Sequence, residues 1–229
     1  MQHSSEVAHS PRLAVLVSGH ARGSNLQALI DAERSQIIQS SVVLVIGTNA
    51  DSAALQRARD AGIDTVVISP NKPGRTEEQY SAALLKALTN REVDVVCLLG
   101  YMRRLPLAIV AQYKHKVLNL HPSLLPLFGG KGMFGLNVHS AVIESGVKVT
   151  GATVHLVDED YDTGPIVVQR VVDVLDDDTP EILARRVLDC EHTAIIEAVR
   201  LVCETGIVVL GRRVTKTNEI LFRSSSRGQ

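Results

Sequence analysis

Residues 117–126 read VLNLHPSLLP, an apolar run that ends on two prolines and carries an amide and an imidazole. If the run up to Leu120 forms a strand, Asn119 and His121 point to the same face, because strand side chains alternate with period two. Pro122 ends such a strand, since proline has no N–H for the ladder. The stretch therefore predicts a hydrogen-bond donor beside a titratable base at the carboxyl end of a strand, where open α/β sheets bind ligands.

A simpler reading of this stretch stays open, in which the Asn starts a turn and a half-buried His bonds to the backbone. A functional role is favoured because of an acidic stretch about forty residues further along the chain, where residues 158–165 read DEDYDTGP. A carboxylate from this loop can orient an imidazole, raise its pKa and relay protons. An amide, a His and an acid near one cleft suit acyl transfer or hydrolysis at a small carbonyl group.

A glycine-containing loop lies near the N-terminus, where residues 18–25 read SGHARGSN between an apolar run and apolar residues at helical spacing. A strand, such a loop and a helix form an anion-binding geometry, because backbone N–H groups and the helix N-terminus face the ligand. The loop matches neither G-x-G-x-x-G nor the P-loop, so it predicts phosphate or carboxylate and does not indicate NAD or ATP. Ser24 and Asn25 are also good helix caps, which explains them equally simply.

Strand and helix patterns alternate along the first half of the chain. Regular alternation predicts an α/β fold with a doubly wound, mostly parallel sheet. Right-handed crossovers then bring residues 19–25, residues 100–104 and the Asn119/His121 pair to one edge, so a cleft is expected there. The predicted strands are 13–17, 41–48, 65–68, 93–99 and 116–120, with helices after the loop to about Arg34 and at 51–61, 76–88 and 107–113.

Beyond Pro126 the pattern changes. Residues 128–135 (FGGKGMFG) hold four glycines, so we expect a flexible loop that covers a bound ligand. An antiparallel C-terminal part is predicted, with strands 150–157 and 166–174 around the acidic loop, a helix from Pro180 to about Glu204 and a final hairpin at 207–214. The expected domain organisation is a disordered leader at 1–12, a single domain at 13–215 and a flexible tail at 216–229.

Composition excludes several classes of protein. The chain of 229 residues is 45% apolar and 3% aromatic, with a net charge of −1, so neither a basic nucleic-acid surface nor aromatic stacking platforms are expected. Its three cysteines form no CxxC pair and predict reduced thiols. No apolar run is long enough for a membrane span and no secretory signal is visible, so a cytoplasmic protein is expected.

The residues also narrow the chemistry. No Ser or Cys lies in a G-x-S-x-G elbow, so direct transfer to an amine is favoured over a covalent enzyme intermediate. His121, His139, His155 and Asp162 are possible metal ligands, but their spacing matches no metal motif, and no metal is predicted.

Taken together, these motifs resemble the formyltransferase family that uses 10-formyltetrahydrofolate, and within it the purine-biosynthesis branch that acts on glycinamide ribonucleotide. The resemblance runs from about Leu13 to Val214 and implies the Rossmann-like formyltransferase fold. It implies transfer of the formyl group to the amine of glycinamide ribonucleotide, giving formylglycinamide ribonucleotide and tetrahydrofolate. It also implies that Asn119, His121 and Asp162 are catalytic, with Asn119 and a protonated His121 stabilising the oxyanion and Asp162 keeping His121 charged.

The resemblance further implies two binding regions. Gly23, Ser24 and Asn25 would bind the substrate phosphate and Glu191 the ribose hydroxyls. The folate pocket would be lined by Met102, Arg103, Leu105, Val157 and Glu159. Plain structural roles remain for these residues: a solvated helix face for Glu191, and packing for the others.

The sequence departs from the family pattern in two loops. Three residues, His20-Ala21-Arg22, separate Gly19 from Gly23 where the family commonly has one, and Arg22 would add charge to the phosphate site. The loop after Pro126 is glycine-rich where a Pro-Gly segment is common, and Lys131 would reach the phosphate or the folate glutamate tail.

Three alternatives remain from the sequence. A formyltetrahydrofolate deformylase shares the catalytic trio but carries an extra N-terminal domain. A methionyl-tRNA formyltransferase adds a C-terminal nucleic-acid-binding domain. A non-catalytic nucleotide-binding module would explain the loop at 19–25 but not the Asn/His/Asp set. The expected partners are therefore small molecules, with neither nucleic acid nor membrane, and the protein is expected to be a monomer or a homodimer.

Overall fold

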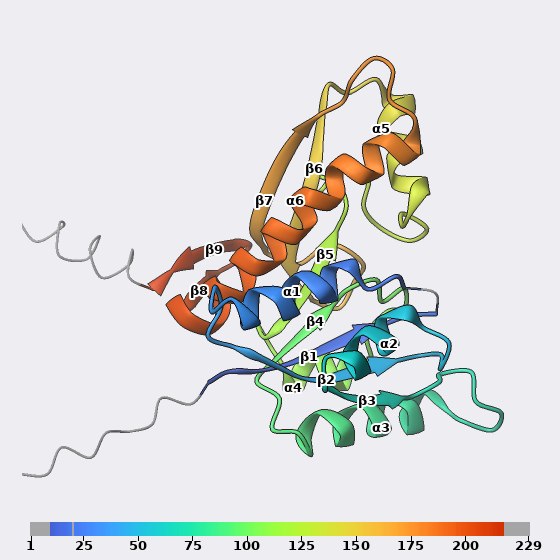
Figure 1. Ribbon diagram of the computed structural model, residues 1–229, viewed down its shortest axis with the longest axis vertical. Helices are drawn as coiled ribbons and strands as arrows, with labels where there is room; N and C mark the ends of the chain where they lie inside the picture. The colour runs from blue at the N-terminus through green and yellow to red at the C-terminus, as the bar shows by residue number, and fades with distance from the viewer. Residues whose placement is uncertain (1–9, 20, 218–229) are drawn as a thin grey trace, which may run out of the picture.

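The computed structural model describes residues 10–19 and 21–217 (Figure 1). The predicted leader up to residue 9, His20 of the phosphate loop and the tail from residue 218 lie outside the described residues. No helix among the described residues is long and apolar enough to cross a membrane.

Within the described residues, nine strands form one sheet in the order β3-β2-β1-β4-β5-β6-β7-β9-β8. The first five strands in the chain pair in parallel, whereas β6 is antiparallel to both β5 and β7, and β8 is antiparallel to β9. The predicted α/β class, mostly parallel with an antiparallel C-terminal part, is confirmed. The strands are β1 (Arg12–Val17), β2 (Ser41–Gly47), β3 (Asp64–Val67), β4 (Val95–Leu98), β5 (Val117–His121), β6 (Val149–Leu156), β7 (Ile166–Asp173), β8 (Ile207–Leu210) and β9 (Arg213–Lys216).

Helices cover both faces of this sheet (Figure 1). One core cluster packs α1, α2, α5 and α6 against the sheet, and a second packs α3 and α4 against the other face. The helices are α1 (Ser24–Arg34), α2 (Ala53–Asp60), α3 (Glu77–Thr89), α4 (Leu107–Gln112), α5 (Leu136–Ser145) and α6 (Pro180–Arg200).

Strand β1 shows why its sequence is apolar at every position. Leu13, Val15 and Val17 belong to the first core cluster, while Ala14 and Leu16 belong to the second. All five are fully buried, as a parallel strand between two helical layers requires. Such a strand reaches the surface only at its two ends. The polar loops of this protein begin at strand ends of this kind.

Several predicted boundaries are shifted by one or more residues, and three of these shifts lie near the ends of the described chain. Strand β1 begins at Arg12, inside the expected leader, and β9 continues to Lys216. The last helix ends as an α-helix at Arg200 and continues as a π-helical turn at Leu201–Thr205, where an α-helix to about Glu204 was predicted. In this widened turn Glu204 accepts the Gln39 N–H at 2.8 Å, which ties the turn to the segment before β2.

Candidate active site

A cleft of about 810 Å³ lies at the carboxyl ends of β1, β4 and β5. Hydrogen bonds join the segments that follow β1 and β4, because Ser18 N–H donates to the Gly100 carbonyl at 3.1 Å and Met102 N–H donates to Ser18 Oγ at 2.9 Å. All three segments predicted to meet at this edge contribute lining residues, so the predicted cleft is confirmed. Its volume is within the range of small-molecule sites.

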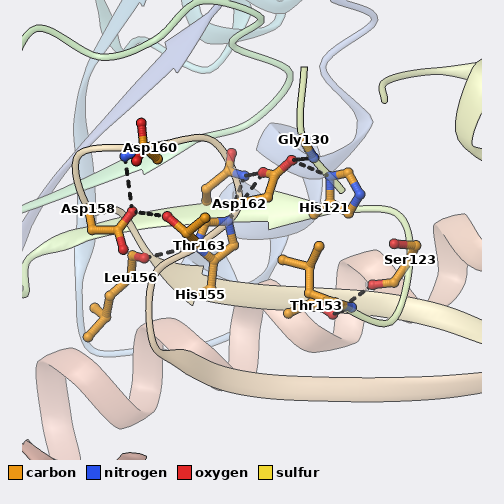
Figure 2. A network of polar contacts seen from close by, with 12 residues as sticks. His121, Ser123, Gly130, Thr153, His155, Leu156, Asp158, Asp160, Asp162 and Thr163 are labelled. Carbon is orange, nitrogen blue, oxygen red and sulfur yellow. Dashed lines mark hydrogen bonds and ion pairs between the residues drawn. The ribbon is translucent and has the colours of Figure 1, made fainter. Parts of the chain in front are cut away.

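Asn119, His121 and Asp162 converge in the wall of this cleft. Figure 2 shows His121 beside Asp162. His121 Nδ1 lies 3.6 Å from Asp162 Oδ2, and Asn119 Nδ2 donates to Asp162 Oδ1 at 3.3 Å. The two β5 side chains therefore share one face, as the period-two argument predicts, and each faces one oxygen of the same carboxylate.

The His121 ring has an acceptor at each nitrogen. Nε2 donates to the Phe128 carbonyl at 2.8 Å, while Nδ1 faces Asp162. The simpler interpretation, in which this His is hydrogen-bonded to the backbone, is thus confirmed. With a second acceptor at Nδ1, the ring is also placed to hold an extra proton.

The electrostatics of the pair favour an ionised Asp162 beside a neutral His121. Burial lowers the pKa of His121, against the Asp162 charge and the Phe128 carbonyl, which both raise it. Burial raises the pKa of Asp162, but the neighbouring imidazoles of His155 and His121 and the hydrogen bond from Gly130 N–H outweigh burial and lower that pKa overall. The proton affinity of His121 therefore depends strongly on the position of Asp162.

His155 is a member of the cluster that sequence reasoning considered only as a metal ligand. It pairs with Asn119 across the β5–β6 ladder, and its Nε2 lies 3.0 Å from Asn119 Nδ2. Its Nδ1–H donates to the Leu156 carbonyl at 2.8 Å, which leaves Nε2 as the acceptor for the Asn119 amide. His155 thus fixes the amide orientation. The sequence signal was its place in a strand predicted to lie beside the acidic loop.

Asp162 reaches the cluster through an unusual backbone conformation. Its φ is +56°, in the left-handed region, and Gly130 N–H donates to its Oδ2 at 2.8 Å. Asp and Asn adopt that region more readily than most residues other than glycine. The carboxylate is therefore held by a turn and by the glycine loop and not by a regular element.

The predicted phosphate loop forms the wall on the α1 side. Gly23 is the N-cap of α1 with φ +79°, and a Cβ there would lie 2.7 Å from the Ala54 Cα, so only glycine fits. No side chain caps α1, so capping does not explain Ser24 and Asn25, which both line the cleft. Arg22 and Arg57 line it too, and Arg57 Nε donates to the Arg22 carbonyl at 2.9 Å. This wall presents helix N–H groups and cations to the cleft.

Glu191 of α6 completes this wall. Asn25 Nδ2 donates to Glu191 Oε2 at 2.7 Å, although the two residues are far apart in sequence. Burial raises the pKa of Glu191 and the bond from Asn25 works against that shift. Asn25 Oδ1 is buried without a hydrogen-bond partner among the described residues. Glu191 is therefore not a plain solvated face, and the pair offers both donors and acceptors to a ligand.

The opposite wall holds four of the five residues predicted for the folate pocket. Met102, Arg103, Leu105 and Val157 line the cleft. Glu159 is exposed and is not among the lining residues, so its place in the folate pocket stays a prediction. Asp158 accepts hydrogen bonds from the Thr163 hydroxyl at 2.6 Å and from the Asp160 N–H at 3.3 Å (Figure 2), and Glu159 lies within the turn that these bonds close.

Two tyrosines behind Arg103 were missed by sequence reasoning. The hydroxyl groups of Tyr80 and Tyr101 lie 2.8 Å apart, and both side chains are buried. The Arg103 guanidinium lies 5.7 Å from the centre of the Tyr80 ring, and its Nε is buried without a partner in the described part of the chain. Aromatic content was taken only as evidence against stacking platforms, and no local pattern links these residues.

The glycine loop lies against the cleft, and its predicted role in covering a bound ligand stays a prediction. Residues from Gly130 to Gly135, Lys131 included, line the cleft. Among residues 10–19 and 21–217, no group of three or more His, Cys, Asp or Glu side chains is arranged to hold a metal ion.

Comparisons with known proteins place this geometry in context. The family model described as formyl transferase matches residues 11–199. The phosphoribosylglycinamide formyltransferase, chloroplastic, of Vigna unguiculata is 41% identical over 197 residues, which cover 86% of this chain. The crystal structure of glycinamide ribonucleotide transformylase 1 from Symbiobacterium toebii is 42% identical with a TM-score of 0.83, covering 91% of this chain and 95% of that one.

A third match is less similar in sequence. The crystal structure of a formyltetrahydrofolate deformylase from Pseudomonas syringae is 26% identical with a TM-score of 0.80, covering 91% of this chain and 66% of that one. The present chain spans 62% of the length of the Vigna protein.

Proposed function

The chain belongs to the formyl transferase family, and from that premise we propose that it transfers a formyl group from 10-formyltetrahydrofolate to the amine of glycinamide ribonucleotide. The products are formylglycinamide ribonucleotide and tetrahydrofolate, in purine biosynthesis. One observation carries the proposal: an amide, an imidazole and a carboxylate meet in a cleft whose two walls suit a phosphorylated amine and a folate.

The α1 wall suits the ribonucleotide. Gly23, Ser24 and Asn25 would bind the phosphate through backbone N–H groups at the start of α1, where the helix dipole favours an anion. Arg22 and Arg57 add positive charge to this wall. Glu191 would accept hydrogen bonds from the ribose hydroxyls, with Asn25 holding its carboxylate.

The opposite wall suits the folate. Met102, Leu105 and Val157 would pack against the flat pterin and benzoyl rings. Arg103 has a buried Nε with no partner among the described residues, so a ligand carbonyl or carboxylate would satisfy it. When bound, the folate supplies the activated formyl group. These features fit 10-formyltetrahydrofolate as the co-substrate, and a reaction without a metal stays a prediction.

Asn119 and His121 would stabilise the oxyanion that forms when the amine attacks the formyl carbon. Both N–H groups of the Asn119 amide donate hydrogen bonds in this structure. One bond goes to His155 at 3.0 Å, and the longer bond goes to Asp162 at 3.3 Å. The substrate oxygen would take over the N–H that faces Asp162. Once protonated, His121 Nδ1 would donate to the same oxygen, while Nε2 keeps its hydrogen bond to the Phe128 carbonyl.

His121 would also move the proton that the reaction transfers. As a neutral imidazole it takes the proton that the amine loses, and it returns that proton to the departing folate nitrogen. Burial disfavours its charged form, so Asp162 has to raise its pKa. The developing oxyanion adds negative charge and favours the imidazolium when it is needed. The protonated His121 implied by the family resemblance thus belongs to the reaction and not to the resting site.

The experiment that tests this function measures tetrahydrofolate release from 10-formyltetrahydrofolate, with and without glycinamide ribonucleotide. Release that requires the ribonucleotide supports the transferase. Release without it points to deformylase chemistry, and no release in either case contradicts both enzymes. Domain limits at 13 and 215, a monomeric or homodimeric state and a cytoplasmic location remain predictions.

A further inference from the structure

We propose that Gly129 and Gly130 are positioning residues for this reaction, because the backbone of residues 128–130 holds His121 and Asp162 in place relative to each other. The proposal rests on the function proposed above. Neither glycine touches the reacting atoms; each acts through the two side chains that do.

The loop holds the catalytic pair from both sides. The Phe128 carbonyl accepts a hydrogen bond from His121 Nε2 at 2.8 Å, and Gly130 N–H donates to Asp162 Oδ2 at 2.8 Å. That same carboxylate oxygen faces His121 Nδ1 at 3.6 Å. Two backbone groups, two residues apart, therefore set both the ring orientation and the carboxylate position.

Gly129 lies between these two anchors, and a side chain there would crowd its neighbours. An added Cβ would lie 2.5 Å from Leu125 Cδ2 and 3.2 Å from Asp162 Cβ. Leu125 is buried, so its side chain has little room to move away. A larger residue at 129 would therefore push on Asp162 directly and on the loop through Leu125.

The backbone conformation around Gly129 is also specific. Phe128 has φ +55° and Gly130 has φ +96°, and a Cβ on Gly130 would meet nothing within 4 Å. Glycine is thus favoured at 130 by the positive φ, whereas at 129 a side chain would meet neighbouring atoms. Together they turn the Phe128 carbonyl toward the ring and the Gly130 N–H toward the carboxylate.

The loop start is anchored to the strand end that carries His121. Ser123 Oγ donates to the Leu127 carbonyl at 2.7 Å. Thr153 Oγ1 donates to the Ser123 carbonyl at 2.6 Å, as Figure 2 shows. Beyond Gly130 the same loop lines the cleft. One segment therefore joins β5, the catalytic pair and the ligand-facing surface.

A graded series at position 129 tests the proposal. We expect kcat to fall about 10-fold in Gly129→Ala and about 100-fold in Gly129→Val, because displacements of up to 1 Å cost this much in oriented reactions. KM for both substrates should stay within about threefold, since neither wall is changed. The double variant Leu125→Ala/Gly129→Ala should regain most of the kcat lost in Gly129→Ala, because it removes the nearest clash.

Titration of the His121 imidazole by NMR supplies a readout independent of turnover. Asp162 raises the pKa of His121, so moving the carboxylate away should lower that pKa further in Gly129→Val. The titratable side chains facing the pair are His155 from β6 and His139 from α5, and both remain in every variant. A loop with a merely structural role would leave the His121 titration unchanged.

Gly47→Ala is the matched control. Gly47 ends β2 and does not line the cleft, and a Cβ there would lie 2.7 Å from Leu55 Cδ1, so it also meets a buried leucine. It should lose some stability while keeping kcat and the His121 titration. The proposal is overturned if folded Gly129→Val keeps the wild-type kcat and the wild-type pKa of His121. It is also overturned if the double variant Leu125→Ala/Gly129→Ala regains none of the kcat lost in Gly129→Ala. Wild-type protein without ribonucleotide-dependent release would contradict the proposed function, while the His121 titration would still report on the loop.

Discussion

Two parts of the catalytic cluster are built in different ways. Asn119 and His121 lie on β5, a strand paired on both sides by β4 and β6, so the pleat fixes the spacing of their side chains. Asp162 lies 43 residues after Asn119, in a turn with φ +56°, and depends on the Gly130 N–H for its place. Changes in the loops should therefore act on catalysis through Asp162, while β5 keeps the other two groups in register.

The largest expected effect comes from the strand-held side. His121→Ala should lower kcat by about 10³-fold, because it removes both proton transfer and one oxyanion donor. Affinity for a non-reactive folate analogue should stay near wild type, since the folate wall is untouched. Steady-state kinetics and calorimetry measure the two quantities.

His115→Ala is the control for removing an imidazole, because His115 is exposed and does not line the cleft. A His121→Ala enzyme with near-normal kcat would show that the base has been assigned to the wrong residue.

The loop-held side should be the next most sensitive. Asp162→Asn keeps the size of the side chain and an acceptor for Gly130 N–H, but removes the charge. We expect kcat to fall about 10²-fold and the pKa of His121 to drop, because Asp162 raises it in the wild type. The pH profile of kcat should then lose the activity that depends on the imidazolium form of His121. NMR titration should show the lower pKa of His121 directly. If the titration of His121 were unchanged in Asp162→Asn, the Asp162 charge would not set the pKa of His121.

A smaller effect is expected from the tyrosine pair behind the folate wall. Tyr101→Phe removes one side of the 2.8 Å contact between the hydroxyl groups of Tyr80 and Tyr101 but keeps the ring. A hydrogen bond contributes about 1 kcal/mol, so KM for 10-formyltetrahydrofolate should rise about fivefold with kcat unchanged. KM for the ribonucleotide, which uses the other wall, is the internal control. Equal changes in both KM values would mean that the pair supports the whole cleft.

The contrast between strand and loop also explains what the sequence predicted. Asn119 and His121 share a face by a local rule, the period of two, and the strand ends meet by a general rule of parallel sheets. The position of Gly130 against Asp162, and of Tyr80 against Tyr101, depends on contacts between residues distant in sequence, for which no local pattern exists. Family resemblance supplied Asp162 and Glu191, and the structure supplied the contacts that hold them.

The smallest expected effect separates two acids of one turn. Glu159 and Asp162 are three residues apart, and resemblance to the family assigned both to the site, but only Asp162 lines the cleft. Glu159→Gln should change kcat and both KM values by less than about twofold, because an exposed carboxylate within the turn is solvated and screened. Asp158→Asn is the informative partner, since Asp158 accepts the Thr163 hydroxyl and the Asp160 N–H that close the turn. If Glu159→Gln raised the folate KM as strongly as Tyr101→Phe, the acidic turn would have to move toward the ligand on binding, and Asp162 would move with it.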